Sequence, residues 1–120
     1  MKHKTPDPKA LNIPNICFSL VAKDDSREEE FKKQRTTRGF DESETWSLTD
    51  TMANFIIPRL ELFQKIIKDV NQDPISVKKS LRAMKLIARD NGARLFSKKE
   101  EKEVEAGLKE FSEVFMRLWW

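Results

Sequence analysis

The sequence is poor in the residue types on which several classes of protein depend. Among 120 residues it has one cysteine, one histidine and no tyrosine, with only three glycines and five prolines. Because Cys17 has no second cysteine to pair with, an internal disulfide is excluded, and so is a zinc site built from cysteine and histidine. So few turn residues also argue against a sheet-rich fold, which leaves a helical protein as the expected class.

Long apolar runs are scarce as well. No uninterrupted apolar run exceeds four residues, whereas a membrane-spanning helix needs about 20. No secretory signal pattern opens the sequence, and a single cysteine suits a reducing compartment. We therefore expect a cytoplasmic protein with no membrane partner.

Groups suited to catalysis are few. The only histidine, His3, lies among residues expected to be unstructured, so a nucleophile–histidine pair is not supported. Carboxylates are abundant, but the four that could bind a metal ion fall on one predicted helix, where they cannot face each other across it. These four are Glu100, Glu103, Glu110 and Glu113. No glycine-rich phosphate loop is present. We expect no enzyme, no cofactor and no bound metal, and keep a metal-dependent nucleotide hydrolase as the third alternative.

The sequence does contain clear helical periodicity. From Leu48 to Val70 apolar residues recur every three or four positions, which predicts one long helix with a single buried stripe. The residues of this stripe are Met52, Phe55, Ile56, Leu60, Phe63, Ile67 and Val70. Asp73–Pro74 ends the pattern, because a proline disfavours helical geometry in the residue before it.

Two further helices follow in the sequence. Ser76 is suited to cap a second helix that ends at Asn91–Gly92. The predicted buried face of this helix consists of Val77, Leu81, Met84 and Ala88. Ser97 and Glu100 have the spacing of a capping box at the start of a third helix. Its predicted buried seam consists of Val104, Leu108, Phe111, Phe115 and Leu118.

These helices predict an all-α fold, a small bundle of three main helices whose short connections favour antiparallel neighbours. A second capping-box pattern, at Ser26 and Glu29, predicts a short additional N-terminal helix. Prolines interrupt the first fifteen residues, where they remove backbone donors. We expect residues 1–15 to be a flexible arm and residues 16–120 to form a single helical domain.

Basic residues follow one face of the second predicted helix. Lys78, Arg82, Lys85 and Arg89 are spaced by four, three and four residues. Such a stripe can neutralise the phosphates of a nucleotide or a nucleic acid, with arginine making bidentate contacts. The alternative is an ordinary solvated face, partly paired with acidic residues of a neighbouring helix.

A second group of candidate ligand-binding residues lies just before the long helix. The segment from Arg38 to Trp46 mixes arginine, carboxylates and aromatics, a composition found in ligand-binding loops. Its candidate binding residues, together with one arginine of the long helix, are Arg38, Asp41, Glu44, Trp46 and Arg59. In the structural alternative, Phe40 and Trp46 close the end of the bundle while Glu44 pairs with Arg59.

Trp119 and Trp120 pose a similar choice between structure and binding. Two adjacent indoles either close the bundle or form an exposed anchor for self-association or for a partner. Since a small bundle offers few places to bury both, we expect an interface here and a homo-oligomer.

Several segments resemble a family of small, uncharacterised bacteriophage accessory proteins. The similarity lies in Arg38-Gly39-Phe40-Asp41, Trp46-Ser47-Leu48, the run from Phe55 to Leu60 with Phe63, and the closing pattern of Gly107-Leu108, Phe111, Phe115 and Leu118-Trp119. The resemblance implies a protein of the infected bacterial host cell. Small phage accessory proteins commonly disable a host factor or sequester a signalling molecule.

Three functions follow in order of preference. The first is a non-enzymatic phage accessory protein that sequesters an anionic nucleotide signal or inhibits a host defence protein. The second is a nucleic-acid-binding protein that uses the basic helix of residues 77–90. The third is the metal-dependent nucleotide hydrolase named above.

Overall fold

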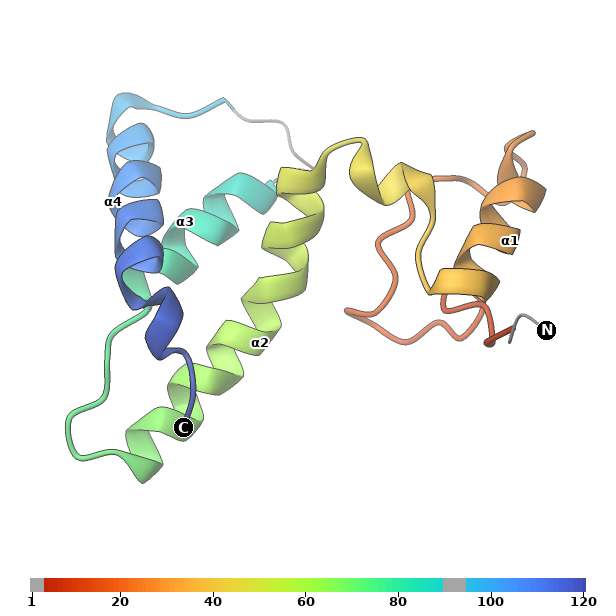
Figure 1. Cartoon of the computed structure of the whole chain (residues 1–120). Helices are drawn as coiled ribbons and strands as arrows, with labels where there is room; N and C mark the ends of the chain where they lie inside the picture. Colours follow the sequence, from red (N-terminus) through yellow and green to blue (C-terminus); the bar gives the residue numbers. More distant parts are fainter. Residues whose placement is uncertain (1–3, 90–94) are drawn as a thin grey trace. The chain divides into compact units, whose positions relative to one another are not determined.

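The computed structural model describes residues 4–89 and 95–120, and within them it contains helices and no strand, which confirms the all-α class (Figure 1). His3 and the predicted helix end at Asn91–Gly92 lie outside the described residues. The elements are α1 (Glu28–Arg38), the 3-10 turn η1 (Glu42–Thr45), α2 (Leu48–Val70), α3 (Lys78–Ala88), α4 (Lys98–Val114) and the 3-10 turn η3 (Phe115–Arg117). No helix of this described part is long and apolar enough to cross a membrane.

The chain divides into two compact units, an N-terminal unit (Met1–Thr51) and a C-terminal unit (Met52–Trp120). This division differs from the boundary expected after residue 15. Residues 4–15 belong with α1, because the backbone amide of Thr5 donates to the carbonyl of Thr36 at 2.7 Å and the Asp7 carboxylate binds Arg35 of α1. The segment expected to be a flexible arm is thus attached to a helix by specific hydrogen bonds.

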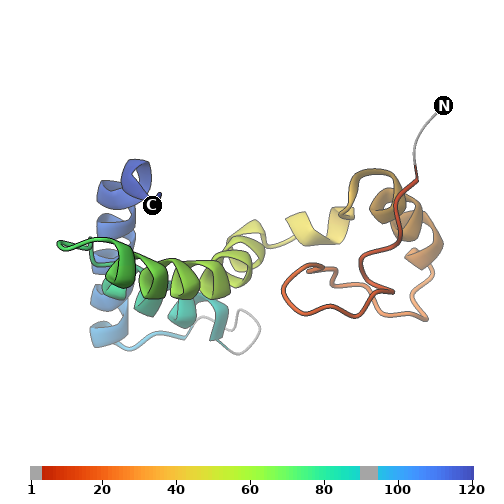
Figure 2. The same cartoon turned by 90° about the horizontal axis from the view of Figure 1, so that it is seen from below.

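The C-terminal unit is built around one apolar core. Leu60 of α2, Leu81 of α3 and Val114 of α4 are buried together with Val77, the residue before α3. The helices α2 and α3 run in roughly opposite directions, whereas α4 crosses α2 steeply (Figure 1 and Figure 2). The predicted stripe of α2 supplies this core through Leu60, and its members Ile56 and Phe63 pack against it. Ile67 of the stripe is also buried, whereas Met52, Phe55 and Val70 are exposed.

Gly107 sets how closely α4 approaches α3. A Cβ atom at this position would lie well inside van der Waals contact with Ala83 Cβ and with the carbonyl oxygen of Lys79. Glycine therefore allows the backbone of α4 to pass directly over the first turns of α3. This close approach fixes which side of α4 is buried.

The predicted seam of α4 is consequently wrong at two positions. Leu108 and Phe115 are 46% and 59% exposed, whereas Gly107 and Val114 are buried. The physical reason is the contact at Gly107, which turns the helix by about one residue from the face that apolar spacing alone selects. Phe111 remains half-buried and stacks on Phe115 with ring centroids 5.6 Å apart.

The first residues of the helices show which of the capping patterns in the sequence correctly predicted a helix start. The capping box of Ser97 and Glu100 is confirmed at the start of α4. The helix α3 begins after Val77, and the predicted cap Ser76 accepts a hydrogen bond from the amide of Lys78 through its Oγ at 3.4 Å. The buried Ser80 of α3 donates through both N and Oγ to Glu110 of α4, at 2.6 and 2.8 Å. The capping box predicted at Ser26 is absent, because α1 begins at Glu28 after an Arg27 that makes no side-chain cap.

Candidate functional site

Two of the predicted ligand-binding residues are internal acceptors of the N-terminal unit. Asp41 is fully buried and forms a capping box with Glu44 at the start of η1. Its carboxylate accepts hydrogen bonds from the hydroxyl of Ser19 at 2.6 Å and from the amide of Ser43 at 2.8 Å. Glu44 accepts from the amides of Asp41 and Phe18, at 2.8 and 3.0 Å. Both carboxylates are therefore engaged with the chain itself.

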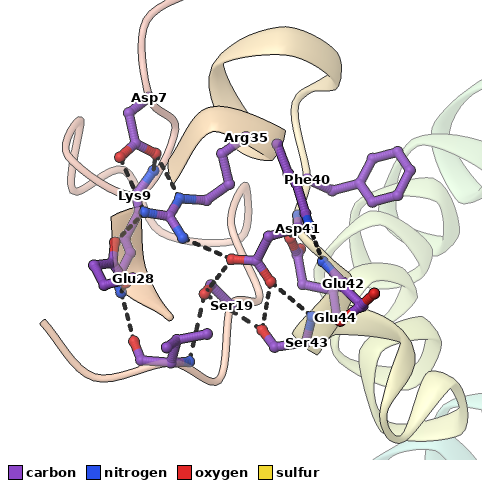
Figure 3. A network of polar contacts seen from close by, with 12 residues as sticks. Asp7, Lys9, Ser19, Glu28, Arg35, Phe40, Asp41, Glu42, Ser43 and Glu44 are labelled. Atoms are coloured by element: carbon purple, nitrogen blue, oxygen red, sulfur yellow. Dashed lines mark hydrogen bonds and ion pairs between the residues drawn. The ribbon is translucent and has the colours of Figure 1, made fainter. Parts of the chain in front are cut away.

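These carboxylates belong to a network centred on Arg35, which the sequence analysis missed (Figure 3). The Arg35 side chain has no exposed surface. Its Nε donates to Asp7 at 2.8 Å and its Nη1 donates to Asp41 at 2.6 Å, while Nη2 bonds Asp7 and Glu28. Lys9 joins the network through an ion pair with Glu28 at 2.9 Å. One guanidinium thus links residues 7, 28 and 41, which lie far apart in the sequence.

The pKa values in the network follow from these contacts. Burial disfavours the charged form of Arg35, but its hydrogen bonds to Asp7, Asp41 and Glu28 outweigh burial and raise the pKa of Arg35 above its ordinary value. The hydrogen bond from Arg35 lowers the pKa of Asp7. Burial opposes ionisation of Asp41, yet its bonds to Ser19, Ser43 and Arg35 leave its pKa lowered. All these groups are charged near neutral pH.

Arginine side chains lie over the aromatic rings of the Arg38–Trp46 segment. The Arg27 guanidinium lies 4.9 Å from the Trp46 ring centroid, and Trp46 meets Phe31 edge-on with centroids 6.0 Å apart. Arg38 lies 4.7 Å from the centroid of Phe40 and donates to the carbonyl of that residue at 3.1 Å. Phe40 and Trp46 remain about half exposed. This surface presents aromatic rings whose faces are partly covered by cations.

Arg59 belongs to the other unit. It lies in α2 within the C-terminal unit, where its guanidinium is 3.8 Å from the ring centroid of Phe55 and donates to the carbonyl of Phe55 at 2.8 Å. The predicted set of ligand-binding residues is therefore divided. Arg38, Asp41, Glu44 and Trp46 lie in the N-terminal unit, and Arg59 lies in the C-terminal unit with the basic residues of α3.

The basic stripe on α3 is largely paired with carboxylates. Arg82 Nε donates to Glu103 at 2.6 Å, and Lys85 is 3.9 Å from Glu61 of α2. Arg89 bonds Glu100 through two nitrogens, which lowers the pKa of Glu100 to about 2. The remaining member, Lys78, is exposed at the start of α3. This arrangement matches the solvated, partly paired face that was the alternative to a phosphate site.

Three of the four α4 carboxylates considered for a metal ion bind other side chains or amides, and the fourth, Glu113, is exposed. Glu100 and Glu103 bind arginines of the α3 segment, and Glu110 accepts from Ser80. Across residues 4–89 and 95–120, no group of three or more histidine, cysteine, aspartate or glutamate residues is placed to hold a metal ion.

Trp119 and Trp120 line a surface cavity of about 310 Å³ within the C-terminal unit. The two indoles are 74% and 67% exposed, although they are the largest apolar side chains of the unit. The remaining lining residues come from the end of α2, the segment after it and η3: Ile67, Val70, Asn71, Ile75 and Arg117. Apolar residues form most of this lining, with one cation and one amide beside them.

Polar residues surround a second cavity, of about 320 Å³, in the N-terminal unit. Lys4, Lys32 and Lys33 line it together with Glu29 and Thr36. It contains no aromatic residue and no buried polar side chain. We therefore regard the Trp119–Trp120 cavity as the better candidate for binding.

Searches of protein-family models, of curated proteins and of solved structures found no match to this chain.

Proposed function

We propose that this chain is a non-enzymatic binding protein whose target is another protein of the infected bacterial cell, in the manner of the phage accessory proteins that it resembles. The observation that carries the proposal is the cavity at Trp119 and Trp120, where two indoles remain mostly exposed around an apolar lining. Inhibition of a host defence protein is the form of binding that we favour.

The composition of this surface supports a protein target. Tryptophan and arginine dominate the residues that contribute most to protein–protein affinity, because they bury large areas and donate directed hydrogen bonds. Both indoles and Arg117 meet at one cavity. Exposing such apolar area to water is unfavourable, so contact with a partner would recover free energy.

The arrangement of charges supports a nucleotide or nucleic acid less well. Of the four basic residues of the stripe, Lys78, Arg82, Lys85 and Arg89, the last three already face a carboxylate. A phosphate would have to displace those contacts, which lowers the gain from binding. Sequestration of a nucleotide and binding of nucleic acid through residues 77–90 therefore remain alternatives that an experiment can separate.

Cross-linking in bacterial cells tests the proposal. A tagged parent protein should retain one host protein, and the double variant Trp119→Ala/Trp120→Ala should lose it while keeping its helicity. The control is Arg82→Ala/Arg89→Ala, which should still retain the partner. If native mass spectrometry instead shows a bound nucleotide that the arginine variant loses, the anion alternative is correct. The same spectra report whether the protein is a homo-oligomer.

A further inference from the structure

We infer that the Trp119–Trp120 cavity receives a large apolar side chain of the partner with a carboxylate next to it. This inference rests on the proposed function, because it names the chemistry of the partner at the same surface. Its geometric basis is an apolar cavity whose lining includes one uncommitted cation, Arg117.

The size and lining of the cavity define the apolar half of the ligand. At about 310 Å³ it lies at the lower limit of the ~300–1,000 Å³ found for ligand cavities, which suits one large side chain. Ile67, which is almost fully buried, and Val70, which is exposed, both line the cavity and present aliphatic carbon to it. An entering aromatic ring would meet these aliphatic groups and the two indoles.

Arg117 defines the charged half of the ligand. It is the one charged residue that lines the cavity. The other arginines within residues 4–89 and 95–120 bind a carboxylate or stack on an aromatic ring. The Arg117 guanidinium, in contrast, makes no ion pair, side-chain hydrogen bond or ring contact with any described residue.

An uncommitted guanidinium beside an apolar cavity selects for negative charge. Its planar fork donates two parallel hydrogen bonds to a carboxylate, and its charge repels a lysine or arginine in the same place. The Asn71 amide adds a second polar group that can bind a carboxylate or a backbone carbonyl. A partner segment with phenylalanine or leucine beside aspartate or glutamate fits both requirements.

Three capped peptides test the inference directly. The first has one phenylalanine between two aspartates, the second has lysines in place of the aspartates, and the third has serine in place of the phenylalanine. Binding is followed by fluorescence in a Trp46→Phe background, where only Trp119 and Trp120 emit. The acidic phenylalanine peptide should shift the emission and bind at least about tenfold more tightly than the other two.

Variants of Arg117 provide the matched controls. Arg117→Gln should weaken the acidic peptide about tenfold, and Arg117→Glu should reverse the preference toward the lysine peptide. Arg117 is exposed, so both variants should keep the helicity of the parent. Equal binding of the acidic and basic peptides, or no effect of Arg117→Gln, would overturn the inference. So would a dimer, seen by ultracentrifugation, whose contact fills the cavity and excludes the peptide.

The two proposals fail in different ways. If a host protein is captured through Trp119 and Trp120 but the peptides show no preference for acidic charge, the chemistry assigned to the partner is wrong and the proposed function stands. If the acidic peptide binds as expected but no host protein is captured, the ligand chemistry is correct and the proposed function is wrong.

Discussion

Arg35 stabilises the N-terminal unit in the way that an apolar core stabilises the C-terminal unit. The large apolar side chains buried in this unit are Val21 and Phe31, so few carbon contacts are available to hold residues 4–51 together. The guanidinium has five donors in a rigid fork and can therefore bind several carboxylates at once. Asp7 comes before α1 and Asp41 after it, so the arginine connects both of these segments to α1, in which Glu28 itself lies.

Removal of this cation is expected to unfold the unit. Arg35→Met would leave buried carboxylates without a counter-charge, at a cost of about 3–5 kcal/mol in the free energy of unfolding. The control Arg38→Met, on the exposed end of the same helix, should change stability by less than about 0.5 kcal/mol. Urea denaturation followed by Trp46 fluorescence in a Trp119→Phe/Trp120→Phe background measures both. Equal stability of the two variants would show that the network is not needed for folding.

Gly107 allows a second prediction, in which the sign of the effect is informative. At an exposed position in the interior of a helix, alanine stabilises the helix by about 1 kcal/mol relative to glycine. At Gly107 the added methyl group would overlap Ala83 and the Lys79 carbonyl, so we expect Gly107→Ala to destabilise by about 1–3 kcal/mol.

The matched control for Gly107 is Ala106→Gly, at an exposed position on the same helix. It should cost about 1 kcal/mol through helix propensity alone. Urea denaturation followed by circular dichroism at 222 nm compares the two variants with the parent. A stabilising effect of Gly107→Ala would show that α4 does not pass this closely over α3.

Single residues also show which roles could be predicted from the sequence and which could not. Asp41 and Glu44 were interpreted as ligand-binding groups, although their spacing of three is that of the capping box they form. That signal was present in the sequence and could have been used. For Arg35 there was no local signal, because its partners Asp7 and Asp41 are brought to it only by the folded chain.

At the scale of helices, periodicity located the elements but not always their buried faces. The steps of three and four correctly predicted α2 and α4, and the capping box correctly predicted where α4 begins. The buried face of α4 could not be predicted, because a pattern of large apolar residues does not mark a glycine as a buried position. In the structure Gly107 is the point of closest contact.

The corrected face of α4 gives a third prediction. Val114→Ala should destabilise the C-terminal unit by about 1–3 kcal/mol, because it leaves a cavity beside Leu60 and Leu81. Leu108→Ala removes a larger but half-exposed side chain and should cost less than Val114→Ala. Thermal melts of both variants decide the matter. If Leu108→Ala is the more damaging change, the seam predicted from the sequence would be the true buried face.

At the scale of the whole molecule, the division into two units had no sequence signal. The apolar pattern that begins at Leu48 continues to Val70, yet the boundary between the units falls between Thr51 and Met52, inside α2. Periodicity reports a continuous helix and cannot report which parts of the chain that helix packs against. The two units also differ in what stabilises them, since a charge network holds one and an apolar core holds the other.

This difference predicts that acid acts first on the N-terminal unit. The pKa values of Asp7, Glu28 and Asp41 are lowered in the folded chain. Their contribution to stability is therefore complete above the unfolded carboxyl pKa of about 4 and is lost as the pH falls through the lower folded values. In Trp119→Phe/Trp120→Phe, Trp46 reports this unit alone. Its urea midpoint should fall steeply between about pH 5 and pH 3.

A variant of the network separates this effect from general acid denaturation. Asp7→Asn removes one of the titrating groups, so its stability should be lower at pH 7 and should change less with pH than that of the parent. The apolar core around Leu60 and Val114 contains no carboxylate. Glu100, whose pKa is lowered by Arg89, is one such group in the C-terminal unit against three in the Arg35 network, so unfolding followed by Trp119 and Trp120 in a Trp46→Phe background should depend on pH less strongly. Parallel pH dependence at the two sets of tryptophans would instead mean that the units unfold as one and that the Arg35 network stabilises the entire chain.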